Sequence, residues 1–398
     1  MNIITISASP YLLTKLGRIN SAVLKFLKEQ GHTINSCVWH HDASYFLPDE
    51  NGIHKFSDIC NLYPLDHNGP SQDQYVVNFY EALKQIRPST VISISDYKDV
   101  NFIAAIKSLY PKAFKWIAIL AIDAIPINEN FLEQLNYIDY AIVTNKFAYE
   151  DMKSKLNVES DYCPFGIDTK IFKPIEIKKD KFRIISLAKN SQACNIAAFI
   201  KSISTVRSTG RNITGYLHTN INDPGDYDIH NLLKRYDENN CIELPNKCIS
   251  VNEGLTDEEL NIEYNKSNII IDCSVRSATA LNIMEAAATG CIPVISNTGS
   301  LKEFVSELPE EFRYIVKGEK FIGEREEELQ IVSMDDLVDK INNLYDLWFE
   351  DKEKYKLLSQ RYIDLAKKYD VDIFLNKINK GINKIVSQIN FMTVENFV

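Results

Sequence analysis

Short apolar runs alternate with segments of helical periodicity along the first half of the chain. The apolar runs are rich in β-branched residues and predict strands at 2–8, 33–39, 90–95, 114–121 and 140–143. Segments whose apolar residues recur every three or four positions predict helices at 19–30, 74–86, 101–110 and 146–155. Residues 40–72 follow neither pattern and are predicted to be irregular. Strands that alternate with helices indicate a parallel sheet covered by helices.

The same alternation starts again after a charged stretch at 176–181, which we interpret as an interdomain linker. The second set of strands is predicted at 182–187, 214–219, 242–244, 269–271 and 293–296. Helices are predicted at 196–207, 256–265 and 280–289, and a helical pattern fills 334–386 as one long amphipathic run from 351 onward. We therefore expect an α/β chain with two Rossmann-like domains.

Composition narrows the possible functions. The chain has 398 residues, which allows two to three domains of about 150 residues each. Its formal net charge of −10 disfavours nucleic acid as a partner, because no basic face stands out. The eight cysteines are scattered without a C-x-x-C pair, which disfavours zinc and indicates reduced thiols and a cytoplasmic location. No uncharged apolar run is long enough for us to expect a transmembrane segment.

The stretch 268–305 carries the clearest candidate chemistry. A strand, a polar loop and a helix follow one another there, and the loop contains Arg276, Ser277, Ala278 and Thr279. Backbone N–H groups at a helix N-terminus attract anions. Glu285 follows about one and a half turns into the helix, where a carboxylate could accept from ribose hydroxyls. The pattern favours a nucleotide site, and the alternative is an ordinary strand–helix–strand unit in which Glu285 is solvated.

This stretch resembles the donor site of retaining glycosyltransferases of family 4, also called group 1. Their motif is, in outline, S-x-x-E-G-F-G-L-P-x-x-E-A-M-A-x-G-x-P-V-V-x-S-x-x-G-x-x-x-E. The matching residues are Ser274, Leu281, Glu285, Ala286, Ala288, Gly290, Pro293, Val294, Ser296, Gly299 and Glu303. The chain departs from the motif at the first glutamate, which is Ser277, at two loop glycines, which are Ala278 and Ala280, and at the proline, which is Asn282.

Three further segments extend the resemblance. Residues 164–174 are similar to the family's P-x-G-V-D-x-x-x-F-x-P, which ends the first domain. Gly17 and Arg18 hold the place of a glycine-bearing loop that lies against the donor phosphates; the alternative for Gly17 is an ordinary turn residue. Asp123 matches an aspartate under the donor sugar, and its alternative role is a helix cap.

The family's two phosphate-binding cations are only half retained. Lys189 stands at the first position, whereas Cys194 replaces the lysine at the second, and Arg276 is the candidate replacement for the lost charge. The sequence also contains Asp226-Tyr227-Asp228, a D-x-D that could bind a metal. Pro224 and Gly225 beside it favour a turn instead, so no metal site is predicted.

The resemblance implies a GT-B fold, in which two Rossmann-like domains with parallel sheets face each other across a cleft. It implies an acceptor domain at 1–176, a donor domain at 177–365 and returning C-terminal helices at 366–398. Its implied activity is transfer of a sugar, with retained configuration and without metal or cofactor, from a UDP- or GDP-sugar to a hydroxyl of a glycan, a lipid-linked or another acceptor. Catalytic roles would fall to Asp123 and Lys189, and donor binding to Gly17, Arg18, Lys189, Arg276, Ser277, Ala278, Thr279, Ala280, Leu281 and Glu285.

Three alternatives remain at this point, one of which is an epimerase or a phosphorylase on the same fold. A degenerate protein that binds nucleotide sugars without turnover is favoured by Ser277 and Cys194. A transferase that glycosylates modified nucleic acid is disfavoured by the acidic composition.

Overall fold

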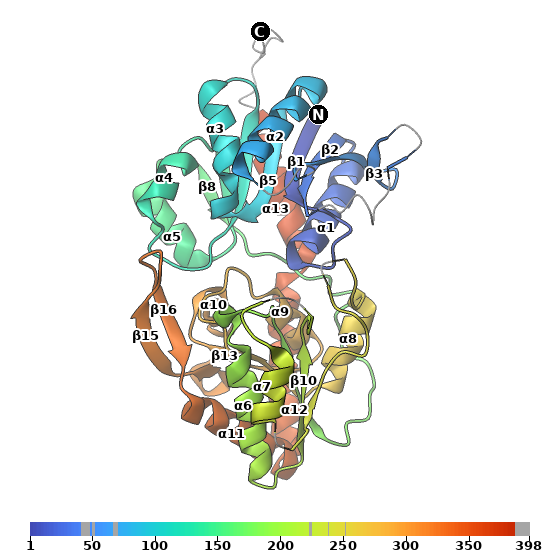
Figure 1. Cartoon of the computed structure of the whole chain (residues 1–398), viewed down its shortest axis with the longest axis vertical. Coiled ribbons are helices and arrows are strands. Elements are labelled where there is room, and N and C mark those ends of the chain that lie inside the picture. The colour runs from blue at the N-terminus through green and yellow to red at the C-terminus, as the bar shows by residue number, and fades with distance from the viewer. Residues whose placement is uncertain are drawn as a thin grey trace. The chain divides into compact units, whose positions relative to one another are not determined.

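The computed structural model describes residues 1–40, 48–49, 52–66, 71–222, 225–237, 239–250 and 252–386 (Figure 1). Internal contacts divide the chain into two compact units. The first comprises Met1–Pro164 and Asp372–Val398, and the second comprises Phe165–Val371. The charged stretch at 176–181 therefore lies within the second unit. No helix among the described residues combines the length and the apolar character that crossing a membrane requires.

The first unit contains an eight-stranded sheet in the order β3-β4-β2-β1-β5-β6-β7-β8. Its strands are β1 (Asn2–Ala8), β2 (Thr33–Trp39), β3 (His54–Phe56), β4 (Cys60–Pro64), β5 (Thr90–Asp96), β6 (Lys115–Ala121), β7 (Tyr140–Val143) and β8 (Ser160–Tyr162). All neighbours pair in parallel except β3 and β4. Its helices are α1 (Lys15–Glu29), α2 (Gln72–Ile86), α3 (Asn101–Leu109), α4 (Glu129–Leu135), α5 (Lys146–Lys155) and α13 (Val371–Val386).

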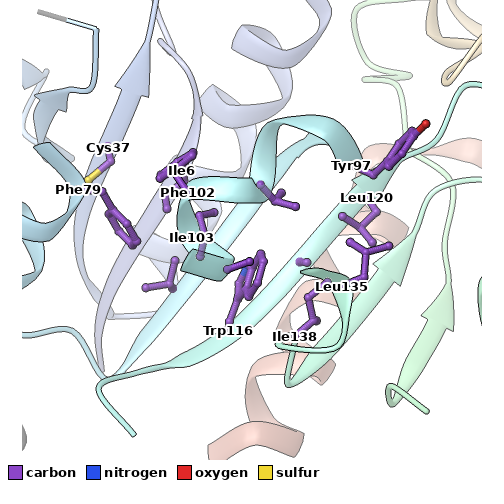
Figure 2. Close-up of a cluster of buried hydrophobic side chains, with 14 of the residues drawn as sticks. Ile6, Cys37, Phe79, Tyr97, Phe102, Ile103, Trp116, Leu120, Leu135 and Ile138 are labelled. Carbon is purple, nitrogen blue, oxygen red and sulfur yellow. The ribbon is translucent and has the colours of Figure 1, made fainter. Parts of the chain in front are cut away.

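A buried apolar cluster holds these elements together. Figure 2 shows Ile6 of β1, Phe79 of α2, Phe102 of α3 and Trp116 of β6 in this cluster. Trp116 is fully buried, and its indole N–H donates to Ser93 Oγ at 2.9 Å. Burial of each such side chain stabilises the fold by roughly 1.5–3 kcal/mol. The β-branched runs of the sequence thus become the inner strands of the sheet.

Two predictions for this unit are wrong. Residues 40–72 are not wholly irregular, because β3 and β4 extend the sheet there; residues 41–47, 50–51 and 67–70 lie outside the described residues. Helix α1 begins at Lys15 rather than at residue 19, because the Thr14 side chain accepts from the Gly17 N–H and caps the helix.

The second unit contains a six-stranded parallel sheet in the order β11-β10-β9-β12-β13-β14. Its strands are β9 (Phe182–Leu187), β10 (Ile213–His218), β11 (Ile242–Glu243), β12 (Ile269–Asp272), β13 (Ile292–Ser296) and β14 (Tyr314–Val316). The helices are α6 (Ile196–Ser208), α7 (Ile229–Tyr236), α8 (Asp257–Lys266), α9 (Leu281–Ala288), α10 (Gly299–Val305), α11 (Met334–Glu350) and α12 (Lys352–Ala366) (Figure 1). The strand order reverses between β9 and β12, and ligands of open α/β sheets bind at such a switch point.

Helix α7, strand β14 and a hairpin were not predicted for this unit, and the prediction of one long C-terminal helical run is wrong. The antiparallel hairpin of β15 (Gly318–Ile322) and β16 (Glu328–Val332) follows β14. The helical run predicted from 351 to 386 is broken after Ala366, where the chain forms an isolated bridge between Asp370 and Ile167. A side chain at Gly166 would approach the Val371 Cα to 2.5 Å, so this contact requires glycine.

Candidate functional site

The carboxyl ends of β9 and β12 lie side by side at the switch point, since these strands pair in parallel. Lys189 follows β9 and is exposed, so its ammonium is accessible at this edge. The next residue, Asn190, is buried, and its side-chain amide bonds to both backbone groups of Tyr227, at 2.7 and 3.2 Å. The turn after β9 is therefore fixed by a residue that the sequence did not single out.

A carboxylate organises the loop that follows β12. Asp272 is 8% exposed and accepts from the Ser274 N–H at 3.0 Å, from the Ser274 hydroxyl at 2.5 Å and from the Asn282 side chain at 3.3 Å. The Val275 N–H donates to Ala193 O at 2.9 Å and ties this loop to the turn after β9. Asn282, which departs from the family motif, thus clamps the start of α9 to the loop.

Ser277 is held within its own loop. Its hydroxyl donates to Thr279 O at 2.8 Å, and its carbonyl accepts from the Ser300 hydroxyl of α10 at 2.9 Å. Ala278 and Thr279 are half-buried, whereas Ala280 and Leu281 are buried. The predicted loop residues are therefore brought together at the same edge of the sheet as Lys189.

Arg276 points toward the unpredicted hairpin. Its Nη1 lies 2.9 Å from Glu327 Oε1, and that carboxylate is 3% exposed. Glu327 also accepts from Arg325, through Nε at 3.3 Å and the backbone N–H at 2.8 Å. Burial by itself would raise the pKa of Glu327. The hydrogen bonds and the two guanidinium charges outweigh burial and hold this pKa below its usual value. Arg276 and Glu327 are 51 residues apart, so no local pattern could have paired them.

Helix α9 combines an open N-terminus with a buried acid. Its N-cap is Ala280, which offers no side-chain acceptor for the first N–H groups. Glu285, four residues after the first helical position, is 3% exposed and accepts from the Tyr264 hydroxyl at 3.0 Å. The alternative in which Glu285 is a solvated carboxylate is therefore wrong. A buried carboxylate beside an anion-attracting helix end suits a nucleotide chemically.

The residues predicted in the first unit lie near the corresponding edge of its sheet. Asp123 follows β6 by two residues and is half-buried, and Asn128 rather than Asp123 caps α4. Gly17 and Arg18 lie in the first turn of α1, not in a loop. A side chain at Gly17 would meet Leu12 O at 2.4 Å, so glycine is required there for packing.

The carboxylates of the D-x-D motif accept hydrogen bonds from backbone N–H groups. Asp228 caps α7 by accepting from the Asn231 N–H at 2.9 Å, and Asp226 accepts from the Gln192 N–H at 2.7 Å. Over the described part of the chain, no group of three or more histidine, cysteine or acidic side chains has the arrangement of a metal site.

His218 ends β10 beside this edge and was also missed by the sequence analysis. Burial lowers the pKa of His218 to about 4, and its Nδ1 lies 3.4 Å from the Tyr216 hydroxyl. It is therefore neutral at pH 7. A histidine at the end of a predicted strand was the only sequence signal that could have drawn attention to it.

No family model matches the sequence, and no curated protein matches it significantly. Solved structures do match. Sucrose-phosphate synthase from Thermosynechococcus elongatus aligns with a TM-score of 0.76 at 13% identity, covering 97% of this chain and 99% of that chain. A glycosyltransferase from Rickettsia africae aligns with a TM-score of 0.70 at 14% identity, covering 98% of this chain and 99% of that chain. The catalytic domain of starch synthase IV from Arabidopsis thaliana, bound to ADP and acarbose, aligns with a TM-score of 0.67 at 13% identity. The alignment covers 97% of this chain and 99% of that chain. Together with the two Rossmann-like units, these similarities establish that the chain has the GT-B fold.

Proposed function

We propose that this protein is a glycosyltransferase that moves a sugar from a nucleoside diphosphate sugar to an acceptor hydroxyl with retained configuration, as family 4 enzymes do. The observation that carries the proposal is the loop–helix unit at the switch point. There, the N-terminus of α9 has no side-chain cap and Glu285 is buried on the same helix. The fold is shared with the starch synthase that binds ADP, which supports a nucleotide as the ligand.

The proposed roles of the site residues follow from their charges. A diphosphate leaving group gains negative charge as its bond to the sugar breaks, so stabilising it is the main electrostatic task. Lys189 and the N–H groups at the start of α9 supply positive potential for it, whereas the charge of Arg276 is already balanced by Glu327. Glu285 would accept from the ribose hydroxyls. The donor-site roles of Gly17 and Arg18, and the catalytic role of Asp123 under the donor sugar, remain predictions from the resemblance.

Ser277 is a specific reason to keep the alternative of a degenerate protein that binds nucleotide sugars without turnover. The family's glutamate at this position is replaced by a hydroxyl that donates to Thr279 O within the loop. A protein altered in this way could bind nucleotide sugars without turning them over. Binding and turnover therefore have to be measured separately.

The test uses the full-length chain with UDP-, GDP- and ADP-sugars. Binding is followed as a rise in melting temperature, because a ligand of the native state stabilises it. Turnover is followed as release of nucleoside diphosphate, with and without a panel of sugar acceptors, and the anomeric configuration of the product is assigned by NMR. Binding with turnover and retention supports the proposal. Binding without turnover supports the degenerate alternative, and absence of binding to every donor refutes both.

A further inference from the structure

The second unit contains a cavity of about 530 Å³ that has no part in the site described above. It extends from the start of β9 and β10, where Arg183 and Thr214 line it, past Tyr216 of β10 to the segment after β11, and it is bordered by 177–181 and α8. Lys189 lies beyond the carboxyl end of β9, and the four residue steps from Arg183 to Leu187 span roughly 13 Å of that strand. The lysine-bearing side of the cavity therefore lies near the amino ends of the strands, and none of the residues that line the cavity is a predicted donor-site residue.

The cavity has an excess of positive charge in an otherwise acidic protein. Five cationic and three acidic side chains line it. Each acid already has a cationic partner: Asp180 lies 2.9 Å from Lys178, Glu243 lies 3.3 Å from Arg183, and Glu263 lies 2.7 Å from both Arg183 and Lys266. The two remaining cations, Lys179 and Lys181, form no ion pair with any described residue.

Lys179 is the better defined of these two cations. It is half-buried, and its ammonium donates to Ser267 O at 2.6 Å. An ammonium has three donors, and this carbonyl takes one. Burial lowers the pKa of Lys179, because the charged form is less well solvated there than in water. A desolvated cation without a counter-charge is stabilised by any anion that enters beside it.

The remaining walls are ordered and mostly polar. The Arg183 guanidinium lies 4.4 Å from the centre of the Tyr216 ring and is fixed by Glu243, Glu263 and the Ser267 hydroxyl. Thr214 and Asn246 add groups that can bond to ligand hydroxyls. The volume falls in the range of small-molecule sites.

We propose that this cavity binds a small hydroxylated phosphate monoester, with Lys179 and Lys181 on the phosphate. Two lysines without counter-charges match a group that carries close to two negative charges at pH 7, whereas a carboxylate carries one. Thr214, Tyr216 and Asn246 would then face the hydroxyl-bearing part of the ligand. The site is independent of the proposed glycosyl transfer, so neither hypothesis depends on the other.

The test is calorimetric titration of the full-length protein with glucose 6-phosphate, glycerol 3-phosphate and inorganic phosphate, with glucose and sulfate as controls at constant ionic strength. We expect the esters to bind most tightly, inorganic phosphate and sulfate to bind at least tenfold more weakly because they lack the hydroxyl-bearing part, and glucose not to bind. Lys179→Met and Lys181→Met should each weaken ester binding at least tenfold, whereas Lys356→Met, which removes a 72% exposed lysine on α12, should change it less than twofold. Ester affinity should be the same in the presence of saturating UDP.

Several results would overturn the proposal. They are failure of both esters to bind, sulfate binding as tightly as the esters, competition between the esters and UDP, or full affinity in Lys179→Met. If Lys179→Met does not fold, Lys181→Met decides, because residue 181 is exposed and its replacement leaves no buried group unpaired.

Discussion

A matched pair of substitutions can separate a role of Glu285 in nucleotide binding from a role in stabilising the fold. Glu285→Gln keeps the size of the side chain and an oxygen that can accept from the Tyr264 hydroxyl, now at 3.0 Å, but removes the charge. Tyr264→Phe removes the same hydrogen bond from the other side and leaves the carboxylate in place. Both side chains are buried, with Glu285 3% exposed and Tyr264 fully enclosed, so any effect of either substitution on stability should be measurable.

The expected magnitudes differ between the two variants. A hydrogen bond to a charged group contributes about 1.5–3 kcal/mol, and a neutral bond about 1 kcal/mol. Replacing the carboxylate by an amide should therefore cost nucleotide binding about 1.5 kcal/mol, or about tenfold in Kd. Stability should change by less than about 1 kcal/mol in Glu285→Gln, because the bond to Tyr264 can persist. Tyr264→Phe should lower stability by about 1–3 kcal/mol, since it removes a hydroxyl donor from a buried carboxylate.

The assays are calorimetric titration with UDP, GDP and ADP and thermal melts of each variant without ligand. Glu353→Gln is the control, because Glu353 is an 86% exposed carboxylate on α12. Our reasoning is refuted if Glu285→Gln binds the preferred nucleotide as tightly as wild type does. It is also refuted if Glu285→Gln loses stability as much as Tyr264→Phe does, since Glu285 would then be a structural residue.

Four further predictions follow from the site. Ser277→Glu should impair turnover, because it places an uncompensated charge in a loop adapted to a hydroxyl; turnover gained only in this variant would favour the degenerate alternative. Turnover should persist in EDTA, since the backbone N–H groups of Gln192 and Asn231 already bind the D-x-D carboxylates, and loss restored by Mn²⁺ would contradict this. Glu327→Gln should lower stability by about 2 kcal/mol in denaturant melts, because two arginines lose their shared counter-charge, whereas Glu324→Gln at a 78% exposed position should have little effect. Burial lowers the pKa of His218 from 6.5 to about 4, so protonation at low pH favours the unfolded state. The free energy of unfolding should therefore be unaffected above pH 6.5 and fall by about 3 kcal/mol as the pH drops toward 4. His218→Gln should flatten the pH dependence of the melting temperature over that range, and an unchanged profile would show that His218 is not the cause.

The alternation of apolar runs and helical segments was enough to predict most of both sheets. The strands at 2–8, 33–39 and 140–143 have the predicted bounds, because most of their side chains are buried, as in strands covered on both faces. The loop and helix around 272–289 were also predicted within one or two residues, since Gly290 ends α9 and the alanines of α9 allow close packing. These features are local, so the order of residues determines them.

The tertiary structure decided what local patterns could not. Strands β3 and β4 contain only three and five residues, and they are strands because the edge of β2 pairs with β4. The helical run after 351 is interrupted because residues 369–371 bond to Ile167, two hundred positions earlier in the chain. Arg276 could be assigned a partner only when the hairpin brought Glu327 beside it, and the cavity at Lys179 exists only where the 177–181 segment folds over α8. Composition and periodicity therefore determined the layers and the loop–helix unit, whereas ion pairs, short strands and cavities depend on residues that are distant in sequence and meet only after folding.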